Sequence, residues 1–122
     1  MPRVVHFELA VSDPERAAQF YREVFEWNIT KWEGPQDYWL VGTGSGERGI
    51  DGGLLMRRDE NQPQTVNTVD VPSVDDYVAR VERSGGRVAL PKMAIPGVGW
   101  LAYCIDPDGV MFGMMQPDEN AK

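Results

Sequence analysis

The sequence repeats one pattern of residues at a spacing of sixty positions. A strand-like run that ends at Val11 is matched by one that ends at Val71, and Asp13 and Ser73, which are both good helix caps, follow them. Glycines extend the match toward the end of each copy: Gly49 with Gly109, and Gly53 with Gly113. Because an internal repeat indicates one structural unit built twice, we expect the chain to fold as two similar halves.

The first copy begins with a strand over residues 4–11, VVHFELAV. It is rich in β-branched and aromatic residues, and polar residues interrupt it at every second position. Since side chains alternate across a strand, one face carries His6, Glu8 and Ala10. The other face is the expected core face, and it carries apolar side chains: Val5, Phe7, Leu9 and Val11.

A helix over residues 14–25 is predicted to follow that strand. Asp13 can accept hydrogen bonds from the free amides of the first turn, and Pro14 suits the first helical position. One stripe of the helix is apolar and is expected to face the core: Ala17, Ala18, Tyr21, Val24 and Phe25. Glu26 stands where the second copy has Gly86, so it either adopts a strained left-handed conformation or leaves the helix differently.

The remaining pattern completes two βαβββ units, which gives an α+β fold with two modules in tandem. Further strands are predicted at residues 27–32, 38–43, 50–56, 65–71, 87–90, 99–105 and 110–116, and a second helix from Ser73 to about residue 83. Residues 44–47 form a predicted turn, and residues 91–98, which contain two prolines, a predicted loop. We expect a single domain over residues 1–122, with modules at about 1–57 and 65–117, a linker at 58–64 and a frayed tail at 118–122.

Composition narrows the classes of function. The net charge of −7 argues against nucleic acid and anionic membranes as partners, because both require clustered Lys and Arg. The single cysteine, Cys104, excludes an internal disulfide, and its apolar surroundings favour a packed, inert thiol. The chain has no apolar run long enough to span a membrane, and its first residues lack a signal-peptide pattern, so we expect a cytoplasmic protein.

Four segments carry a resemblance to a known family: VVHFELAVSDPERAAQFYREVF, GIDGGLL, SGGRV and IPGVGWLAYCIDPDGVMFGMMQ. Together with the paired βαβββ pattern, they resemble the vicinal oxygen chelate superfamily, which includes glyoxalase I, bleomycin-resistance proteins and extradiol dioxygenases. The resemblance implies a glyoxalase/bleomycin-resistance-like fold and a homodimer. The fold hosts many chemistries, so function has to be argued from the site.

In members that use a metal, the resemblance implies one ligand on the first strand and one on the last strand of each half. Those positions hold His6, Gly53, Val66 and Gly113, of which His6 alone has a donor side chain. A catalytic divalent metal needs about three protein ligands, so we expect no metal site and no cofactor. Glu8 and Asp51 remain as conceivable carboxylates near the site.

The candidate site residues follow from these positions. His6 and Glu8 could form a catalytic pair, because an imidazole beside a carboxylate can act as a general base at neutral pH. A lone histidine on a strand is more often a hydrogen-bonded structural residue than a catalyst. The predicted ligand-binding residues are His6 and three side chains of the second copy: Trp100, Tyr103 and Met111. Aromatic side chains can stack on a flat ligand or belong to the core.

Three functions remain open from the sequence. The first is a metal-free protein that binds a small hydrophobic or planar molecule, in the manner of the drug-sequestering branch of the family. The second is an enzyme, such as a metal-dependent lyase or dioxygenase, that uses His6. The third is a non-catalytic interaction subunit. Metal analysis separates the second from the first, and a screen for bound ligands separates the first from the third.

Overall fold

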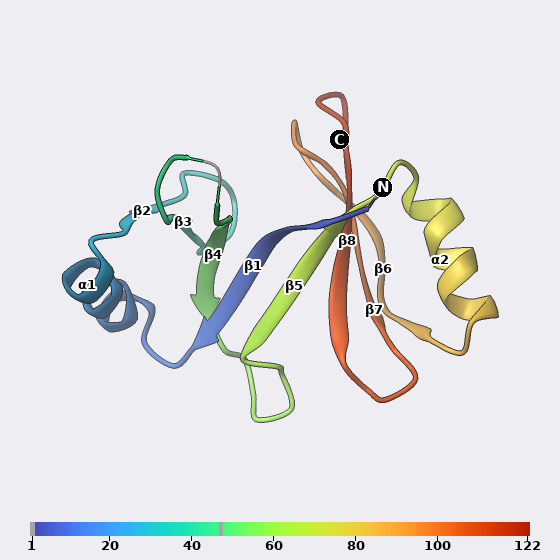
Figure 1. Cartoon of the computed structure of the whole chain (residues 1–122), viewed down its shortest axis with the longest axis horizontal. Coiled ribbons are helices and arrows are strands. Elements are labelled where there is room, and N and C mark those ends of the chain that lie inside the picture. Colours follow the sequence, from blue (N-terminus) through green and yellow to red (C-terminus); the bar gives the residue numbers. More distant parts are fainter. Residues whose placement is uncertain (1, 47) are drawn as a thin grey trace. The chain divides into compact units, whose positions relative to one another are not determined.

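The computed structural model describes residues 2–46 and 48–122, so Glu47 of the predicted 44–47 turn lies outside the described residues. The elements follow in the order β1 (Val4–Val11), α1 (Pro14–Phe25), β2 (Asn28–Lys31), β3 (Trp39–Gly42), β4 (Asp51–Met56), β5 (Thr65–Asp70), α2 (Val74–Arg83), β6 (Arg87–Ile95), β7 (Gly99–Ile105) and β8 (Met111–Pro117) (Figure 1). This order confirms the predicted α+β fold with two βαβββ modules.

The chain divides into two compact units. One unit contains residues 6–66, and the other contains residues 67–122 together with the first five residues. Arg3 shows why the start of the chain belongs to the later unit. Its N–H donates to Asp70 Oδ1 at 2.9 Å, and its carbonyl accepts from the Asp70 N–H at 3.0 Å. The division between the two units thus falls after residue 66, and Arg3 pairs with the second copy.

The strand order is the same in both copies. In the unit of residues 6–66 it is β2-β3-β4-β1, and in the other unit it is β6-β7-β8-β5. The first strand of each copy runs parallel to the last, with Glu8 opposite Gly53 and Thr68 opposite Gly113. Both pairs are related by a shift of sixty, so the repeat read from the sequence holds at the level of single residue pairs.

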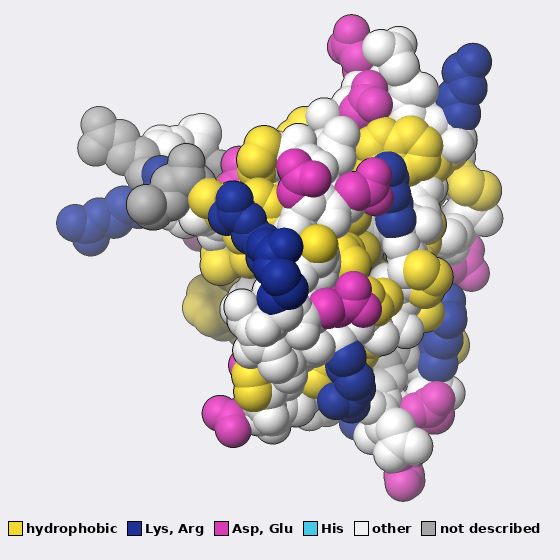
Figure 2. Space-filling model, turned by 90° about the vertical axis from the view of Figure 1, so that its right-hand side faces the viewer, with side chains coloured by type: hydrophobic (Ala, Val, Ile, Leu, Met, Phe, Trp, Pro, Cys, Tyr) yellow, Lys and Arg dark blue, Asp and Glu magenta, His cyan; other side chains and the backbone are white. Residues whose placement is uncertain are grey.

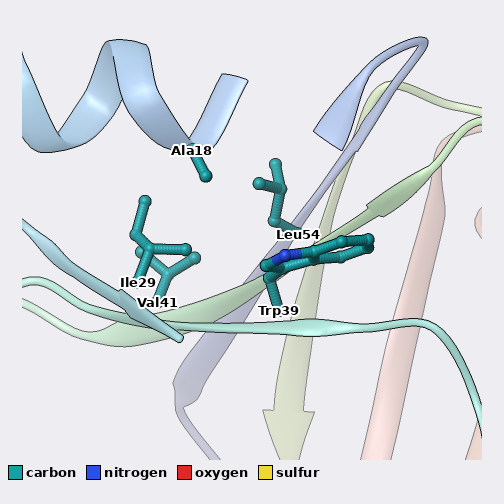
Figure 3. Close-up of a cluster of buried hydrophobic side chains, with 5 residues drawn as sticks. All are labelled: Ala18, Ile29, Trp39, Val41 and Leu54. Carbon is teal, nitrogen blue, oxygen red and sulfur yellow. The ribbon is translucent and has the colours of Figure 1, made fainter. Parts of the chain in front are cut away.

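The core of the first unit lies between α1 and one face of its strands. Figure 3 shows the buried cluster of Ala18, Ile29, Trp39, Val41 and Leu54. The predicted core face of β1 packs against this cluster through Phe7, Leu9 and Val11, whereas Val5, predicted on the same face, is 44% exposed. The opposite face of β1, which holds His6 and Glu8, is therefore directed away from α1.

The predicted apolar stripe of α1 is too wide. Ala18 is buried and Tyr21 is half-buried, but Val24 and Phe25 are 52% and 54% exposed. Trp27 follows the helix, and the Tyr21 and Phe25 ring centroids lie 5.3 Å and 5.1 Å from that of Trp27. Tyr21 and Trp27 pack against the core cluster, whereas Phe25 stacks on them at the end of the helix and stays exposed.

The ends of α1 confirm the predicted signals. Asp13 Oδ1 accepts from the Arg16 N–H at 3.1 Å, and Pro14 occupies the first helical position. Glu26 adopts φ 59°, in the left-handed region, while its N–H donates to the Arg22 carbonyl at 3.0 Å. A non-glycine residue pays roughly 1–2 kcal/mol in this conformation, so the helix end is strained as the sequence indicates.

The core of the second unit lies between α2 and its strands, around Val71, Val74, Ala102, Cys104 and Met114. Cys104 is fully buried, and burial raises the pKa of its thiol, with the Glu82 carboxylate adding to the effect. Both effects disfavour the thiolate, which is the reactive form. The prediction that Cys104 is packed is confirmed, and its inertness stays a prediction.

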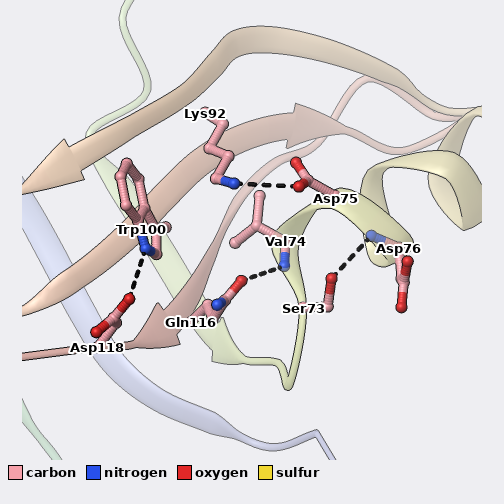
Figure 4. A network of polar contacts seen from close by, with 8 residues as sticks. All are labelled: Ser73, Val74, Asp75, Asp76, Lys92, Trp100, Gln116 and Asp118. Carbon is pink, nitrogen blue, oxygen red and sulfur yellow. Dashed lines mark hydrogen bonds and ion pairs between the residues drawn. The ribbon is translucent and has the colours of Figure 1, made fainter. Parts of the chain in front are cut away.

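Polar contacts fix the start of α2, as Figure 4 shows. Ser73 Oγ accepts from the Asp76 N–H at 3.2 Å, which confirms the predicted cap. Gln116 Oε1 of β8 accepts from the Val74 N–H at 3.0 Å. Asp75 of the first turn pairs with Lys92 of β6 at 3.1 Å, so the helix start is tied to two strands.

Two predictions in the second unit are wrong. The strand predicted at residues 87–90 continues through the predicted loop to Ile95, and its register against β7 shifts between Val88 and Leu90 and again between Leu90 and Met93. These irregularities accommodate Pro91, since β6 is an edge strand in its unit and needs no donor on its outer side.

The tail is also ordered rather than frayed. Ala121 is 3% exposed, and its carbonyl accepts from the Gly97 N–H at 3.0 Å. The Asp118 N–H donates to the Val98 carbonyl at 3.0 Å. The tail therefore docks on the turn between β6 and β7, because its backbone groups find partners there.

Surface charges are mixed. Figure 2 shows acidic and basic side chains interspersed, with hydrophobic side chains between them, on the face that it presents. A continuous basic stripe of the kind that binds nucleic acid does not gather on that face. Among the residues that the structure describes, no helix is both long enough and apolar enough to cross a membrane.

Candidate functional site

Three polar side chains of the first unit form a hydrogen-bonded chain. His6 and Glu8 lie on the face of β1 that is directed away from α1, and Tyr38 immediately precedes β3. The Tyr38 hydroxyl donates to Glu8 Oε2 at 2.9 Å, and it lies 2.9 Å from His6 Nε2. The predicted pair of His6 and Glu8 is thus brought together through a third residue that the sequence analysis did not identify.

Gly53 provides the space for this arrangement. It pairs with Glu8 across the β1–β4 ladder, on the same face as the hydrogen-bonded chain. A Cβ atom built on Gly53 would collide with the hydroxyl and ring of Tyr38. The Tyr38 hydroxyl therefore occupies the volume that any side chain at position 53 would need.

The electrostatics of the site favour a neutral imidazole. Burial lowers the pKa of His6 from its ordinary value of 6.5, and the nearby carboxylates of Glu8 and Asp51 oppose this effect in part. Asp51 lies opposite His6 in the ladder, and its Oδ1 accepts from the Thr43 N–H at 2.9 Å. Burial outweighs the two carboxylates, so His6 is uncharged around neutral pH.

Apolar side chains lie on the same face as the polar chain. The ring of Trp32 meets that of Tyr38 edge to face, with centroids 6.2 Å apart. Gly34 permits this position of Trp32, because a side chain there would collide with the indole. Leu40 pairs with Gly53 and is 45% exposed on the same face. The face thus offers a few polar groups beside exposed apolar surface, which is the composition of small-molecule sites.

The donor set does not fit the metal that the fold family implies. Within residues 2–46 and 48–122, no group of three or more His, Cys, Asp or Glu side chains could hold a metal ion. The position of the expected second ligand is Gly53, and the Tyr38 hydroxyl fills its place. His6 and Glu8 are both engaged with that hydroxyl, whereas a catalytic metal needs about three ligands that converge on one point.

The other candidate residues belong to the unit of residues 67–122. Tyr103 pairs with Gly113 and Met111 pairs with Ile105, so the two side chains share one face of the β7–β8 ladder. A Cβ atom on Gly113 would lie 2.9 Å from Thr68 Oγ1 and 3.3 Å from the Tyr103 ring. Tyr103 therefore lies over Gly113, as Tyr38 lies over Gly53, but less closely.

Trp100 lies on the opposite face from Tyr103, because three positions separate the two residues along β7. Its ring packs against the buried cluster beneath α2, and its Nε1–H donates to Asp118 Oδ2 at 3.0 Å (Figure 4). Lys92 Nζ lies 4.8 Å from the ring centroid. The structure thus brings Tyr103 and Met111 to one face and Trp100 to the other, and the ligand-binding roles of all three stay predictions.

Tyr38 is the site residue that sequence reasoning missed. One signal was present: a glycine inside a strand often marks the close approach of another group, and Gly53 stands in the middle of a predicted strand. The approaching group could not be named, because Tyr38 begins a different predicted strand, fifteen positions earlier, and the sequence does not show which strands pair.

Comparisons with known proteins agree with this fold. The family model for the Glyoxalase/Bleomycin resistance protein/Dioxygenase superfamily matches residues 3–114. No curated protein matches the chain in a sequence search.

Solved structures match over nearly the whole chain. The methylmalonyl-CoA epimerase from Mycobacterium tuberculosis has 14% identity and a TM-score of 0.72, and covers 94% of this chain and 87% of its own. The hypothetical protein BH1468 from Bacillus halodurans C-125 has 16% identity and a TM-score of 0.71, with coverages of 99% and 98%. A variant of the methylmalonyl-CoA epimerase of Streptomyces coelicolor, in complex with 2-nitronate-propionyl-CoA, has 15% identity and a TM-score of 0.68, with coverages of 98% and 97%. At these identities the likeness establishes the fold alone.

Proposed function

The chain belongs to the Glyoxalase/Bleomycin resistance protein/Dioxygenase superfamily, and we propose that within it the chain is a small-molecule-binding protein that works without a metal centre. The proposed ligand is a small hydrophobic or planar molecule. It contacts the face of the first unit that carries His6, Tyr38 and Leu40. Tyr103 and Met111 stay separate ligand-binding candidates within the unit of residues 67–122.

One observation carries the proposal: the Tyr38 hydroxyl fills the volume in front of Gly53 and binds both ionisable residues of the site. A metal ion would have to displace this hydroxyl, and position 53 would offer it no ligand. In the part of the chain that the structure describes, no group of three or more His, Cys, Asp or Glu side chains could hold such an ion. The exposed apolar surface of Leu40 and the half-buried rings of Trp32 and Tyr38 suit an organic ligand better.

Metal analysis tests the metal-free part of the proposal. Protein purified without added metal should contain far less than one ion per chain. It should also gain no thermal stability from zinc, nickel, iron or manganese, because an ion that binds the folded state at a concentration above its Kd would raise the melting temperature. A control variant, Tyr38→Phe, opens part of the volume that the hydroxyl fills and tests whether Tyr38 alone blocks the ion. Stoichiometric metal in the wild-type protein would overturn the proposal.

A thermal-shift screen over planar compounds and small dicarbonyl compounds tests the binding part. For a compound that stabilises the wild-type protein, His6→Ala should weaken binding more than it lowers the melting temperature, since His6 belongs to the ligand face. A large loss of stability with unchanged binding would assign His6 to structure. A screen without any stabilising compound would favour an interaction subunit that has no ligand.

A second candidate is an enzyme that transfers a proton without a metal. The specific observation in its favour is that a neutral histidine is linked through Tyr38 to a carboxylate, which suits general acid–base chemistry. Its test is the exchange of a bound compound's carbon-bound hydrogen with deuterated water, followed by NMR. Exchange that is lost in His6→Ala would establish catalysis, whereas binding without exchange would leave the chain a binder.

A homodimer and a cytoplasmic location belong to the same proposal. The superfamily resemblance implies the dimer, and the acidic net charge suits a freely dissolved protein. Sedimentation at several concentrations would measure the mass of the assembly. A mass of one chain throughout would remove the dimer from the proposal without affecting the binding face.

A further inference from the structure

The protons available along the hydrogen-bonded chain determine which ring nitrogen of His6 is protonated. The Tyr38 hydroxyl has a single proton, and that proton is donated to Glu8 Oε2. The same hydroxyl lies 2.9 Å from His6 Nε2. Because the hydroxyl has no second proton to give, the bond to His6 requires the imidazole to donate through an Nε2–H group.

This assignment leaves Nδ1 as the ring nitrogen that carries a lone pair. In a neutral imidazole one nitrogen holds the proton and the other accepts hydrogen bonds. The groups that face His6 are the carboxylates of Glu8 and Asp51 and the hydroxyl of Tyr38. The carboxylates can only accept, and the Tyr38 proton is engaged, so these three side chains offer the ligand no proton.

We propose that Tyr38 and Glu8 are positioning residues that hold His6 as its Nε2–H tautomer, so that the site presents the Nδ1 lone pair to its ligand. The ligand class that fits is a small planar molecule with an acidic O–H or N–H group, such as a phenol, an imide or an enol. This inference rests on the proposed binding function and adds that the ligand donates a hydrogen bond.

Gly53 makes the same hydrogen-bonded arrangement possible. Its missing side chain lets the Tyr38 hydroxyl reach both partners at once, and the Trp32 ring meets the Tyr38 ring from the side. Two side chains of β1 and one glycine of β4 thus converge on a single hydroxyl. The tautomer of His6 is consequently set by residues that come from three separate segments of the chain.

The test uses the fact that His6 is the only histidine. In full-length protein labelled with ¹⁵N-histidine, long-range ¹H–¹⁵N correlations distinguish a protonated ring nitrogen from a bare one. At about pH 8, where an ordinary histidine is neutral, wild-type Nε2 should be protonated and Nδ1 bare. Nδ1 protonated in the wild type, or an even mixture of the two tautomers, would overturn the inference.

Two variants test the positioning role. Glu8→Ala removes the acceptor of the Tyr38 proton, so Tyr38 becomes able to donate to Nε2, and the population should shift toward the Nδ1–H tautomer. Tyr38→Phe should give a mixture of both tautomers, while Tyr21→Phe, a control in the aromatic cluster beside α1, should leave the wild-type pattern unchanged. A wild-type pattern in Glu8→Ala would show that Glu8 has no positioning role.

Phenol and its methyl ether, anisole, test the ligand class. Phenol should move the Nδ1 resonance toward that of a hydrogen-bonded nitrogen, and anisole, which cannot donate, should not. An unchanged Nδ1 with phenol, or an equal shift with anisole, overturns the inferred ligand class. A compound from the thermal-shift screen that stabilises the protein but does not shift the Nδ1 resonance would also overturn the inferred ligand class. The proposed binding function would then remain intact. A screen without stabilising compounds overturns the proposed function, while the tautomer is still decided by the ligand-free spectrum.

Discussion

Gly53→Ala is the substitution that most directly probes the candidate site. A Cβ atom at this position collides with the hydroxyl and ring of Tyr38, so the Tyr38 side chain must move away. Its movement breaks the hydrogen bonds to Glu8 Oε2 and His6 Nε2, each 2.9 Å long. The backbone itself tolerates alanine, because Gly53 does not have a positive φ.

The expected magnitude follows from these losses. A hydrogen bond to a charged group contributes about 1.5–3 kcal/mol and a neutral one about 0.5–1.5 kcal/mol. Water can replace part of both in a half-buried site, and a tolerated Gly→Ala change regains about 0.4–1 kcal/mol from the unfolded state. A net loss of about 2 kcal/mol remains, which lowers the melting temperature of a domain of this size by roughly 8 °C.

Denaturant unfolding and calorimetry would measure the loss in four proteins: the wild type, Gly53→Ala, Tyr38→Ala and the double variant. Once Tyr38 is truncated, the atoms with which the new methyl group at position 53 would collide are absent. Adding Gly53→Ala to Tyr38→Ala should therefore leave the free energy of unfolding unchanged or raise it slightly. Gly42→Ala is the matched control. It also lies on a strand without a positive φ, but its Cβ would meet the Asn28 carbonyl at an ordinary 3.5 Å.

Two outcomes would refute this reasoning. If Gly53→Ala were no more destabilising than Gly42→Ala, the close approach of Tyr38 would not exist. If the effects of Gly53→Ala and Tyr38→Ala simply added, the two residues would not be coupled, although contacting residues normally show an interaction energy. The hydrogen-bonded chain could not then be the element that excludes a metal.

Two further predictions concern titration. Burial lowers the His6 pKa below 6.5 in the folded protein, so the unfolded chain binds a proton more readily than the folded one. The contribution of His6 to the free energy of unfolding should therefore be complete above pH 6.5 and should be lost as the pH falls through the folded pKa. His6→Gln should remove this slope from stability measured between about pH 5 and 8, and an unchanged slope would contradict the assignment. The Trp100 hydrogen bond and the Asn120 backbone lower the Asp118 pKa, so Trp100→Phe should raise that pKa toward its usual range and speed hydrogen exchange at the Gly97 amide. Weakened binding of a screened ligand in Trp100→Phe would instead place the indole in the binding site.

The sequence predicted those parts of the fold that depend on local pattern. The alternation in residues 4–11 identified the core face of β1, and Asp13 with Pro14 located the start of α1 at its observed residue. The repeat at a spacing of sixty matched Gly53 with Gly113, and the structure pairs them with Glu8 and Thr68, which are related by the same shift. These features follow from backbone geometry and side-chain periodicity, which a single sequence displays directly.

Features that depend on tertiary contacts could not be predicted in this way. Pro91 signals a loop, yet β6 continues past it because the strand edge needs no donor there and the register shifts to fit. The tail is polar, but Ala121 is buried because the turn at Gly97 offers it a partner. Tyr38 joins the site because Gly53 leaves room for its hydroxyl, and the two residues meet only in the folded unit.

The two copies share a scaffold and differ in the chemistry that they place on it. Where the first copy has His6 and Glu8, the second has Val66 and Thr68 at the equivalent positions. In both copies the residue opposite the second position is a glycine. Thr68 is buried, and its hydroxyl carries no charge at any accessible pH, so it cannot replace a carboxylate as the acceptor of a tyrosine proton with comparable strength. The same residue-by-residue register that relates the two copies therefore assigns the titratable hydrogen-bonded chain to the unit of residues 6–66. A ligand that depends on the His6 lone pair would consequently be recognised by that unit.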